Sequence, residues 1–178
     1  TPTPPIAAQL NPQTKSLLEG ATASVAMVNQ AADLAAGPGM EQAVAAAQSG
    51  TNGFGVISGG SSRYESGSHV DVKSVNLLLG MSHGLSNSAG NLTLGGFVEF
   101  GHGGYDSYNS FATRPSVHAD GDLRYYGAGA LFKQDFNQGA FVEGGLRAGR
   151  VWQDYDSADL TSGGLPVHYS RNSSYYGA

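Results

Sequence analysis

The sequence predicts an all-β fold, an antiparallel up-and-down transmembrane β-barrel with a helix before its first strand. Three observations lead to this prediction. Strand-like segments of about ten residues recur, apolar and polar side chains alternate within them, and from residue 83 onward their links are alternately short and long. Successive side chains of a strand point to opposite faces. A tilted strand crosses a bilayer in roughly 9–11 residues, with lipid on one face and a polar lumen on the other.

The segment 91–100 shows the alternation best. One face carries the apolar residues Leu92, Leu94, Val98 and Phe100. The opposite face carries Asn91, Thr93, Phe97 and Glu99. We therefore expect the first set to meet lipid and the second set to line the interior.

Composition limits the possible functions. The chain has 178 residues, within the range for one domain, and only 13% of them are charged. A net charge of −5 argues against nucleic acid as a partner, because phosphate binding needs clustered Lys and Arg. Cysteine is absent, which excludes disulfides and thiolate metal sites. No stretch is apolar enough to span lipid as a helix, so we expect strands to make any membrane crossing.

We expect four parts along the chain: a disordered Pro-rich linker, a helix, a connector with room for a short second helix, and a strand region, at 1–10, 11–37, 38–52 and 53–178. Within the last part we expect strands near 54–64, 69–82, 90–102, 121–133, 139–152 and 167–178. Compact turn sequences lie at 87–90 and 137–139, and long polar loops are expected at 104–120 and 155–166. The second strand loses its alternation between Lys73 and Leu79, which a β-bulge would explain.

The helix has clear start and stop signals. Asn11 can cap it, Pro12 suits its first position, and Gly37-Pro38-Gly39 is expected to end it. About 25 residues reach roughly 37 Å, enough to thread a bilayer core of about 30 Å. Small residues keep the helix thin, and a weak apolar stripe is made by Leu17, Leu18, Ala21, Val25, Val28 and Ala32. A surface helix on a soluble domain is the other interpretation.

Charged residues within the strands are the candidate lumen-facing groups: Glu99, Arg124, Glu143 and Arg147. An arginine facing lipid near the bilayer midplane costs roughly 2–4 kcal/mol, so inward placement is favoured. The alternation equally allows solvent-facing charges on a soluble β-sandwich.

The sequence offers little for enzyme chemistry. Its five histidines lack the HExxH spacing of a metal site, and GxSxG and phosphate-loop motifs are absent. The local material for a membrane-protease active site is limited to His102, Asp106, His118 and Asp120. We expect no catalytic residue, no bound metal and no cofactor.

Two segments of the helical region, 15–20 and 28–34, resemble the linker helix that precedes autotransporter β-domains. Five later segments are similar to strand motifs of the same family: 66–70, 95–101, 121–127, 144–149 and 174–178. The ordered set covers most of residues 15–178.

The resemblance implies a type V secretion translocator. Such a domain is a barrel of typically about twelve strands that exports an N-terminal passenger and anchors it at the cell surface. It implies the outer membrane of a Gram-negative bacterium, no enzymatic activity, and three partners: outer-membrane lipid, the chain's own N-terminal passenger domain and the barrel-assembly machinery. The pore helix would lie at about 12–36, and its candidate residues are Leu17, Val25, Asn29 and Asp33.

The chain departs from this family in length, because it offers only about six of the expected strands. We therefore expect the N-terminal half of such a domain. The alternative is a soluble or surface-exposed all-β adhesive or binding module.

Overall fold

The computed structural model describes residues 11–65 and 68–178, so the linker expected at 1–10 lies outside the described residues. It contains a helical arm followed by one six-stranded sheet in the order β1-β2-β3-β4-β5-β6, in which every neighbouring pair is antiparallel. The predicted all-β, antiparallel, up-and-down fold is confirmed at this level. The sheet is not closed: within the described residues, β1 and β6 are its two edges.

The strands are longer than the sequence predicts. They span Thr51–Glu65 (β1), His69–Asn87 (β2), Gly90–Phe111 (β3), Arg114–Phe136 (β4), Phe141–Ser162 (β5) and Leu165–Gly177 (β6). The prediction of long loops at 104–120 and 155–166 is wrong. These segments are paired strands that extend the hairpins β3–β4 and β5–β6. Cross-strand hydrogen bonds satisfy most of their backbone groups despite their polar composition.

The β-bulge expected between Lys73 and Leu79 is also wrong. β2 pairs with β1 and β3 in unbroken register, and Lys73, Val75, Leu77 and Leu79 all lie on one face. The polar residues Ser74 and Asn76 lie on the opposite face, where both are buried. The pattern looked broken because this strand places Leu78 inward beside them.

The helical arm begins as the sequence predicts. The Asn11 side chain accepts a hydrogen bond from the backbone N–H of Gln13 at 3.2 Å, and Pro12 follows it. The arm starts as a 3₁₀ helix, Pro12–Leu18, and continues as α1, Glu19–Leu34.

We expected the helix to end at Gly37-Pro38-Gly39, but it continues through this segment. A π-helical turn, Ala35–Gly39, contains Pro38 and leads directly into α2, Met40–Ala47. A wider turn accommodates a proline, which has no N–H to donate and whose ring crowds the preceding turn. Much of the expected connector at 38–52 is therefore helical.

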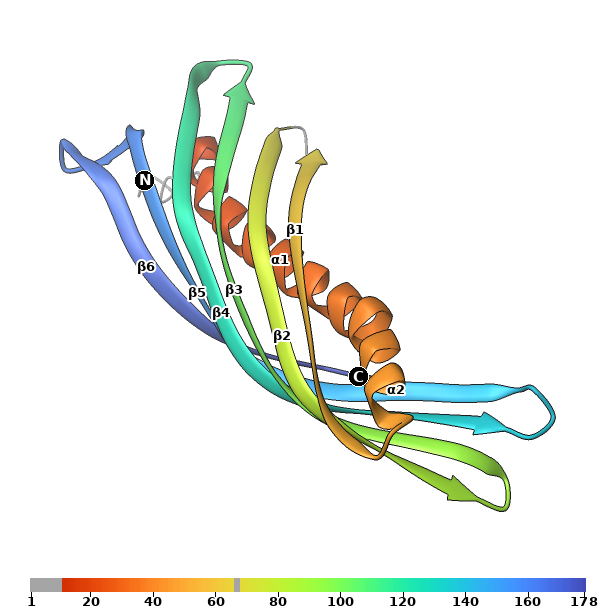
Figure 1. Cartoon of the computed structure of the whole chain (residues 1–178). Helices are drawn as coiled ribbons and strands as arrows, with labels where there is room; N and C mark the ends of the chain where they lie inside the picture. Colours follow the sequence, from red (N-terminus) through yellow and green to blue (C-terminus); the bar gives the residue numbers. More distant parts are fainter. Residues whose placement is uncertain (1–10, 66–67) are drawn as a thin grey trace, which may run out of the picture.

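The helical arm lies along the concave face of the curved sheet (Figure 1). Near the start of the arm, Ala23, Ala26, Met27 and Ala31 pack against a cluster of buried side chains from the strands, Val70, Val72, Tyr105, Ala119, Leu123, Tyr125, Val151 and Tyr155. A second cluster surrounds the π turn and α2 and includes Leu34, Met40, Phe54, Leu78, Phe97 and Leu131. Within the described residues, no helix is both long and apolar enough to span a membrane.

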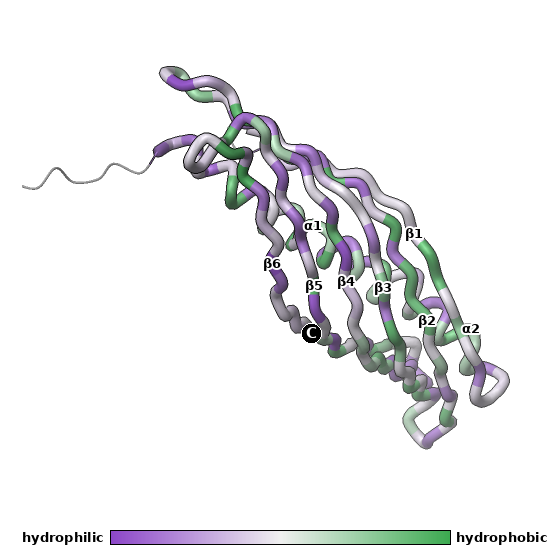
Figure 2. Tube along the Cα trace, turned by 90° about the vertical axis from the view of Figure 1, so that its left-hand side faces the viewer, coloured by the Kyte–Doolittle hydropathy of each residue, from purple (hydrophilic) through white to green (hydrophobic). Residues whose placement is uncertain are grey.

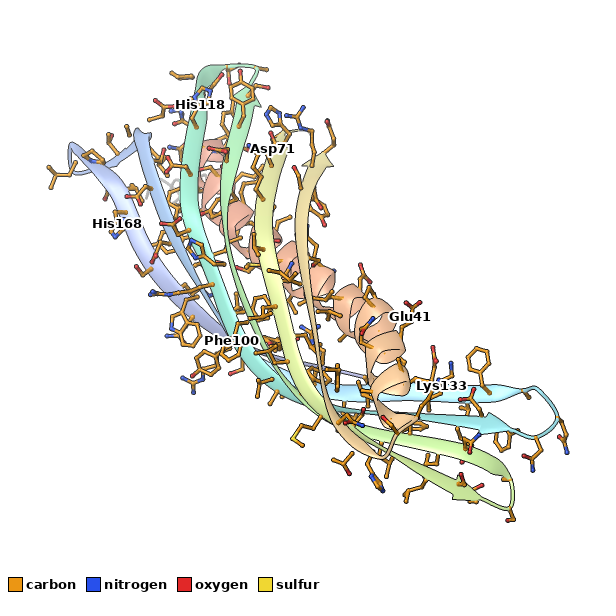
Figure 3. All side chains as sticks on the ribbon, viewed as in Figure 1. Glu41, Asp71, Phe100, His118, Lys133 and His168 are labelled. Carbon is orange, nitrogen blue, oxygen red and sulfur yellow. The ribbon has the colours of Figure 1, made fainter. Side chains whose placement is uncertain are left out.

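Polar and apolar residues alternate along the strands (Figure 2). Large apolar side chains are exposed on the convex face, away from the helix: Ile57, Val75, Leu79, Met81, Leu94, Val98, Phe100, Tyr126, Phe132, Val142, Leu146 and Tyr176. We call these residues the apolar belt. Figure 3 shows Phe100 pointing away from the helical arm, as expected from the sequence.

The two ends of the belt differ. At the end where α1 begins, which we call the upper end, the strands continue beyond the belt to polar hairpins. The labels Asp71, His118 and His168 mark this end in Figure 3. At the lower end, short turns join β2 to β3 and β4 to β5.

Candidate functional site

The candidate site is the interface between the helical arm and the concave face. It combines tightly packed small residues with many polar contacts. Ser16 shares a 2.7 Å hydrogen bond with the Tyr155 hydroxyl, and Ser24 donates to Gln153 Oε1 at 2.7 Å. The Tyr169 hydroxyl donates to the Leu17 carbonyl at 2.7 Å. The helix is therefore seated by hydroxyls and amides as much as by apolar packing.

Gln30 provides a further contact in the C-terminal half of α1. Its Nε2 donates to Ser62 Oγ at 2.8 Å, and its Oε1 accepts a hydrogen bond from Ser74. Gly60 makes room for this side chain, since a Cβ there would lie 3.0 Å from Gln30 Oε1. One helical residue thus bonds to two strands, β1 and β2.

The centre of the site is a buried ionic group. Arg147 Nε lies 3.3 Å from Glu99 Oε1, and the side chains of Arg147 and Glu99 are 9% and 1% exposed. The Tyr175 hydroxyl donates to the same carboxylate oxygen at 2.7 Å, and the Arg147 guanidinium lies 5.0 Å from the Tyr175 ring centre. Arg147 Nη2 also donates to the Val28 carbonyl of α1 at 3.1 Å. The group therefore joins β3, β5, β6 and the helix.

This group retains some unused hydrogen-bonding capacity. Glu99 Oε2 and Arg147 Nη1 are buried and have no hydrogen-bond partner in the described part of the chain. Burying an ion pair removes two charges from water, which is expensive unless all their hydrogen bonds are made. The site therefore carries two buried charges, and one hydrogen-bonding atom of each remains without a partner where β5 and β6 meet the helix.

Three of the four candidate lumen-facing residues lie on the concave face. Glu99 and Arg147 form the buried group just described. Glu143 lies further down β5, opposite Lys133 of β4, and their charged atoms are 3.3 Å apart. This lower pair is partly exposed, with Lys133 at 22% and Glu143 at 36%. That the concave face lines a lumen stays a prediction.

Arg124 corrects the sequence-based interpretation. We expected it to face inward, but it lies exposed on the convex face, while its neighbours Leu123 and Tyr125 are buried against the helix. Directly opposite residues of paired strands face the same side, and Glu99 pairs with Gly127. An inward Glu99 therefore forces the odd-numbered residues of β4 inward. Register between strands outweighs the charge of a single side chain.

The pore-helix candidates divide into two groups. Leu17 packs on the core cluster at the start of the arm. Val25, Asn29 and Asp33 are exposed, and Val25 is 60% exposed. The apolar stripe predicted for the helix is therefore only partly its contact surface: Leu17 and Val28 pack against the core cluster, whereas Leu18 and Val25 are exposed. The small residues Gly20, Ala23 and Ala26 make that contact because they allow close approach.

A groove remains open between α1 and the β5–β6 edge of the sheet. Asn29 and Ala32 line it from the helix, and Arg147, Tyr175 and Ala178 line it from the strands. The groove is continuous with the buried ionic group, because Arg147 belongs to both.

The protease candidates do not converge on the concave site. His102, Asp106, His118 and Asp120 all lie on the convex face, where Asp106 pairs with Asp120 and His102 pairs with Arg124. His118 Nδ1 lies 3.0 Å from a carboxylate oxygen of Asp159. His102 lies four residues along β3 from Asp106, about 13 Å at strand spacing. Across the residues with described positions, no three His, Cys, Asp or Glu residues are grouped to hold a metal ion.

The tyrosines of the concave face were missed by the sequence analysis. Tyr155 and Tyr169 stack with ring centres 5.0 Å apart, and Tyr125 and Tyr175 meet edge to face at 6.0 Å. Glycines provide their space: a Cβ at Gly121 would lie 2.8 Å from the Tyr105 ring. The available signal was the pairing of tyrosines with glycines of neighbouring strands, as Tyr105 pairs with Gly121, Tyr125 with Gly101 and Tyr175 with Gly149.

Comparison with known protein families finds no family that matches this chain, and no curated protein matches its sequence.

Proposed function

We propose that this chain is part of an outer-membrane translocator, the β-domain of an autotransporter. In this proposal it helps to export an N-terminal passenger and to anchor it at the surface of a Gram-negative bacterium. The six strands would form about half of a barrel, with the helical arm in its pore. Its partners would be outer-membrane lipid, its own passenger domain and the barrel-assembly machinery. The proposal involves no enzymatic step and no nucleic acid.

The opposite chemistry of the two sheet faces is the observation that carries this proposal. On the convex face, Ile57 is 71% exposed, Met81 61% and Leu146 67%. A soluble monomer rarely exposes an apolar surface that runs continuously across several strands. On the concave face, Glu99 and Arg147 are buried against the helix. In the proposed barrel the convex face would contact lipid, and the concave face would line a polar lumen that the helix fills. This arrangement accounts for the chemistry of both faces.

The sheet edges support the same proposal. Bare strand edges do not occur in hydrocarbon, because each unpaired N–H and C=O there costs several kcal/mol. Pairing between β5 and β6 stops at Arg147 and Gly177, leaving 141–146 of β5 without a partner on that side within the described residues. Asn29, which lines the open groove, faces the region that closing strands would occupy. Further strands would cover the open groove and complete the wall around the helix.

The nature of the helix contacts fits a plugged pore. Small residues at 20, 23 and 26 let the helix lie close to the wall, and hydroxyl and amide hydrogen bonds fix its position. Water can replace such bonds when the lumen is occupied by a passing chain. A purely apolar interface would have no comparable substitute.

Lipid-accessibility mapping tests the proposal. The chain has no native cysteine, so a single cysteine can carry an environment-sensitive fluorophore. Leu146→Cys and Glu143→Cys form a matched pair, because they lie three residues apart on opposite faces of β5. In lipid vesicles, with the strands that the proposal needs to close the barrel present, we expect spin-labelled lipid to quench the fluorophore at 146 and water-soluble iodide to quench it at 143.

A soluble adhesive or binding module predicts a different result. Its chain would remain in the aqueous phase, and iodide would reach both positions while spin-labelled lipid reached neither. That pattern would refute the translocator proposal.

A further inference from the structure

We propose that the convex face binds an anionic, phosphate-bearing lipid, with Arg124 and Arg150 holding its headgroup at the upper edge of the apolar belt. The inference rests on the proposed membrane insertion and adds the class of lipid that this face recognises. It begins from the unexpected outward position of Arg124.

Four side chains form a square across β4 and β5. Arg124 lies directly opposite Trp152, and Tyr126 lies directly opposite Arg150. The two arginines therefore occupy one diagonal and the two aromatic rings the other. The rings pack together with their centres 5.0 Å apart. Diagonal neighbours in a sheet are separated by roughly 7–8 Å, so both guanidinium groups can reach one phosphate between them.

Two shallow grooves run along the convex face from this square. Both have Phe100 and Tyr126 as a shared wall. In the first, Val75, His102 and Arg124 lie in one row across β2, β3 and β4 at its upper end, and Leu77 lies one step further down. The second is lined by Val98, Ala128, Ala148 and Tyr176 and has Arg150 at its upper end. Each groove is an apolar channel that ends at an arginine.

The arginines are available to an external anion. Both are exposed, and neither forms an ion pair with any residue whose position the structure describes. Arg63, nearer the upper strand ends, is by contrast paired with Asp71. Asp122 and Asp154 lie one step further up on the same face. A phosphate is therefore attracted to the level of the arginines and repelled above it.

The combination of features identifies the ligand as a lipid. Arginine binds phosphate through paired N–H groups, and Trp and Tyr favour the boundary between headgroups and hydrocarbon. A free phosphate ion would use the arginines and leave the grooves empty. A lipid places acyl chains in the apolar grooves and its phosphate on Arg124 and Arg150.

Trp152 is the only tryptophan of the chain, so the quenching of its fluorescence reports which lipid lies beside the site. The protein, together with the strands that close the proposed barrel, is inserted into phosphatidylcholine vesicles that contain an equal small fraction of spin-labelled phosphatidylglycerol or spin-labelled phosphatidylcholine. We expect the anionic spin label to quench Trp152 more strongly, because the site concentrates that lipid. Each arginine should contribute a roughly fivefold local enrichment, so Arg124→Gln/Arg150→Gln should remove the difference between the two lipids.

Arg114→Gln is the matched control, because Arg114 is exposed at the β3–β4 turn and belongs to neither groove. We expect it to keep the preference for the anionic lipid. Equal quenching by both lipids in the parent protein, or a preference that survives in the double variant, would overturn the inference while leaving membrane insertion intact. If neither lipid quenches Trp152, the proposed function and the inference fail together.

Discussion

At the residue scale, the buried Glu99–Arg147 pair decides how the helix meets the sheet. The carboxylate accepts one hydrogen bond from Tyr175, and the guanidinium bonds to the helix backbone at Val28. Because both charged side chains are almost fully buried, each depends on the other for compensation.

We therefore predict that Arg147→Met lowers the free energy of unfolding by about 3 kcal/mol, because it leaves the Glu99 carboxylate buried without its cation. The double variant Glu99→Gln/Arg147→Met should recover most of this loss. Urea unfolding of the inserted protein, arranged as a double-mutant cycle, measures the coupling. The partly exposed pair of Lys133 and Glu143 is the control, and Glu143→Gln should lower stability by less than about 1 kcal/mol. Equal effects at both pairs would contradict the special role of the buried one.

A second residue-scale prediction concerns acid at the upper end of the strands. The backbone N–H of His118 donates to Asp159 at 2.9 Å, and its ring nitrogen lies 3.0 Å away, which together lower the pKa of Asp159 below its ordinary 3.8. The contact therefore contributes stability above pH 3.8 and loses it as the pH falls through the lowered pKa.

Hydrogen exchange of the peptide containing His118 tests this contact. The parent protein should be better protected than Asp159→Asn at neutral pH, and the difference should shrink as the pH falls below 3.8 and disappear below the lowered pKa. Asp71→Asn removes a similar exposed carboxylate, paired with Arg63 instead, and should leave the His118 peptide unchanged. A difference that persisted in acid would exclude the ionised carboxylate as its cause.

At the element scale, the helix is held close to the sheet by its small residues. A Cβ on Gly20 would lie 2.7 Å from Gln153 Nε2 and 2.8 Å from the Tyr105 hydroxyl. Gln153 also accepts the hydrogen bond of Ser24. A larger residue at position 20 would displace this polar contact as well as crowd the interface.

We predict that Gly20→Leu lowers the free energy of unfolding by about 1–3 kcal/mol, because overpacking forces the helix away from β3 and β5. Thermal unfolding measures the change. Gly37→Ala is the control, since nothing lies within 4 Å of a Cβ there, and it should be neutral or slightly stabilising. A neutral Gly20→Leu would mean that the helix is not tightly seated.

At the scale of the whole molecule, the apolar belt determines whether the convex face is more stable in contact with lipid or with water. Val98 lies within the belt and is 44% exposed, whereas Asp106 lies on the same face of β3 beyond its upper edge. These two positions differ mainly in the medium that the proposal assigns to them.

We predict that Val98→Arg destabilises the inserted protein by about 2–4 kcal/mol, because it places a charge near the bilayer midplane. Asp106→Arg should change the free energy by less than about 1 kcal/mol, because interfacial positions tolerate arginine. Reversible folding into vesicles measures both. If Val98→Arg folded as well as the parent protein, the belt would face water.

How much the sequence could predict also depends on scale. Alternation in 91–100 correctly placed Thr93, Phe97 and Glu99 on one face, because that strand alternates without ambiguity. Sorting residues by charge failed at Arg124, because the inward face of β4 is set by its pairing with β3. The polar composition of 104–120 suggested a loop, yet hairpin pairing satisfies its backbone.

The sequence by itself determined the class of fold: the number and order of the strands, the capped helix before them, and the alternation that separates two faces. These are local properties, set by side-chain periodicity and by capping and turn chemistry over a few residues. Tertiary structure alone decided which face of α1 contacts the sheet, how far the strands extend, and that Arg124 lies beside Trp152 on the convex face. Those outcomes depend on register and close packing between distant segments, which no local pattern encodes.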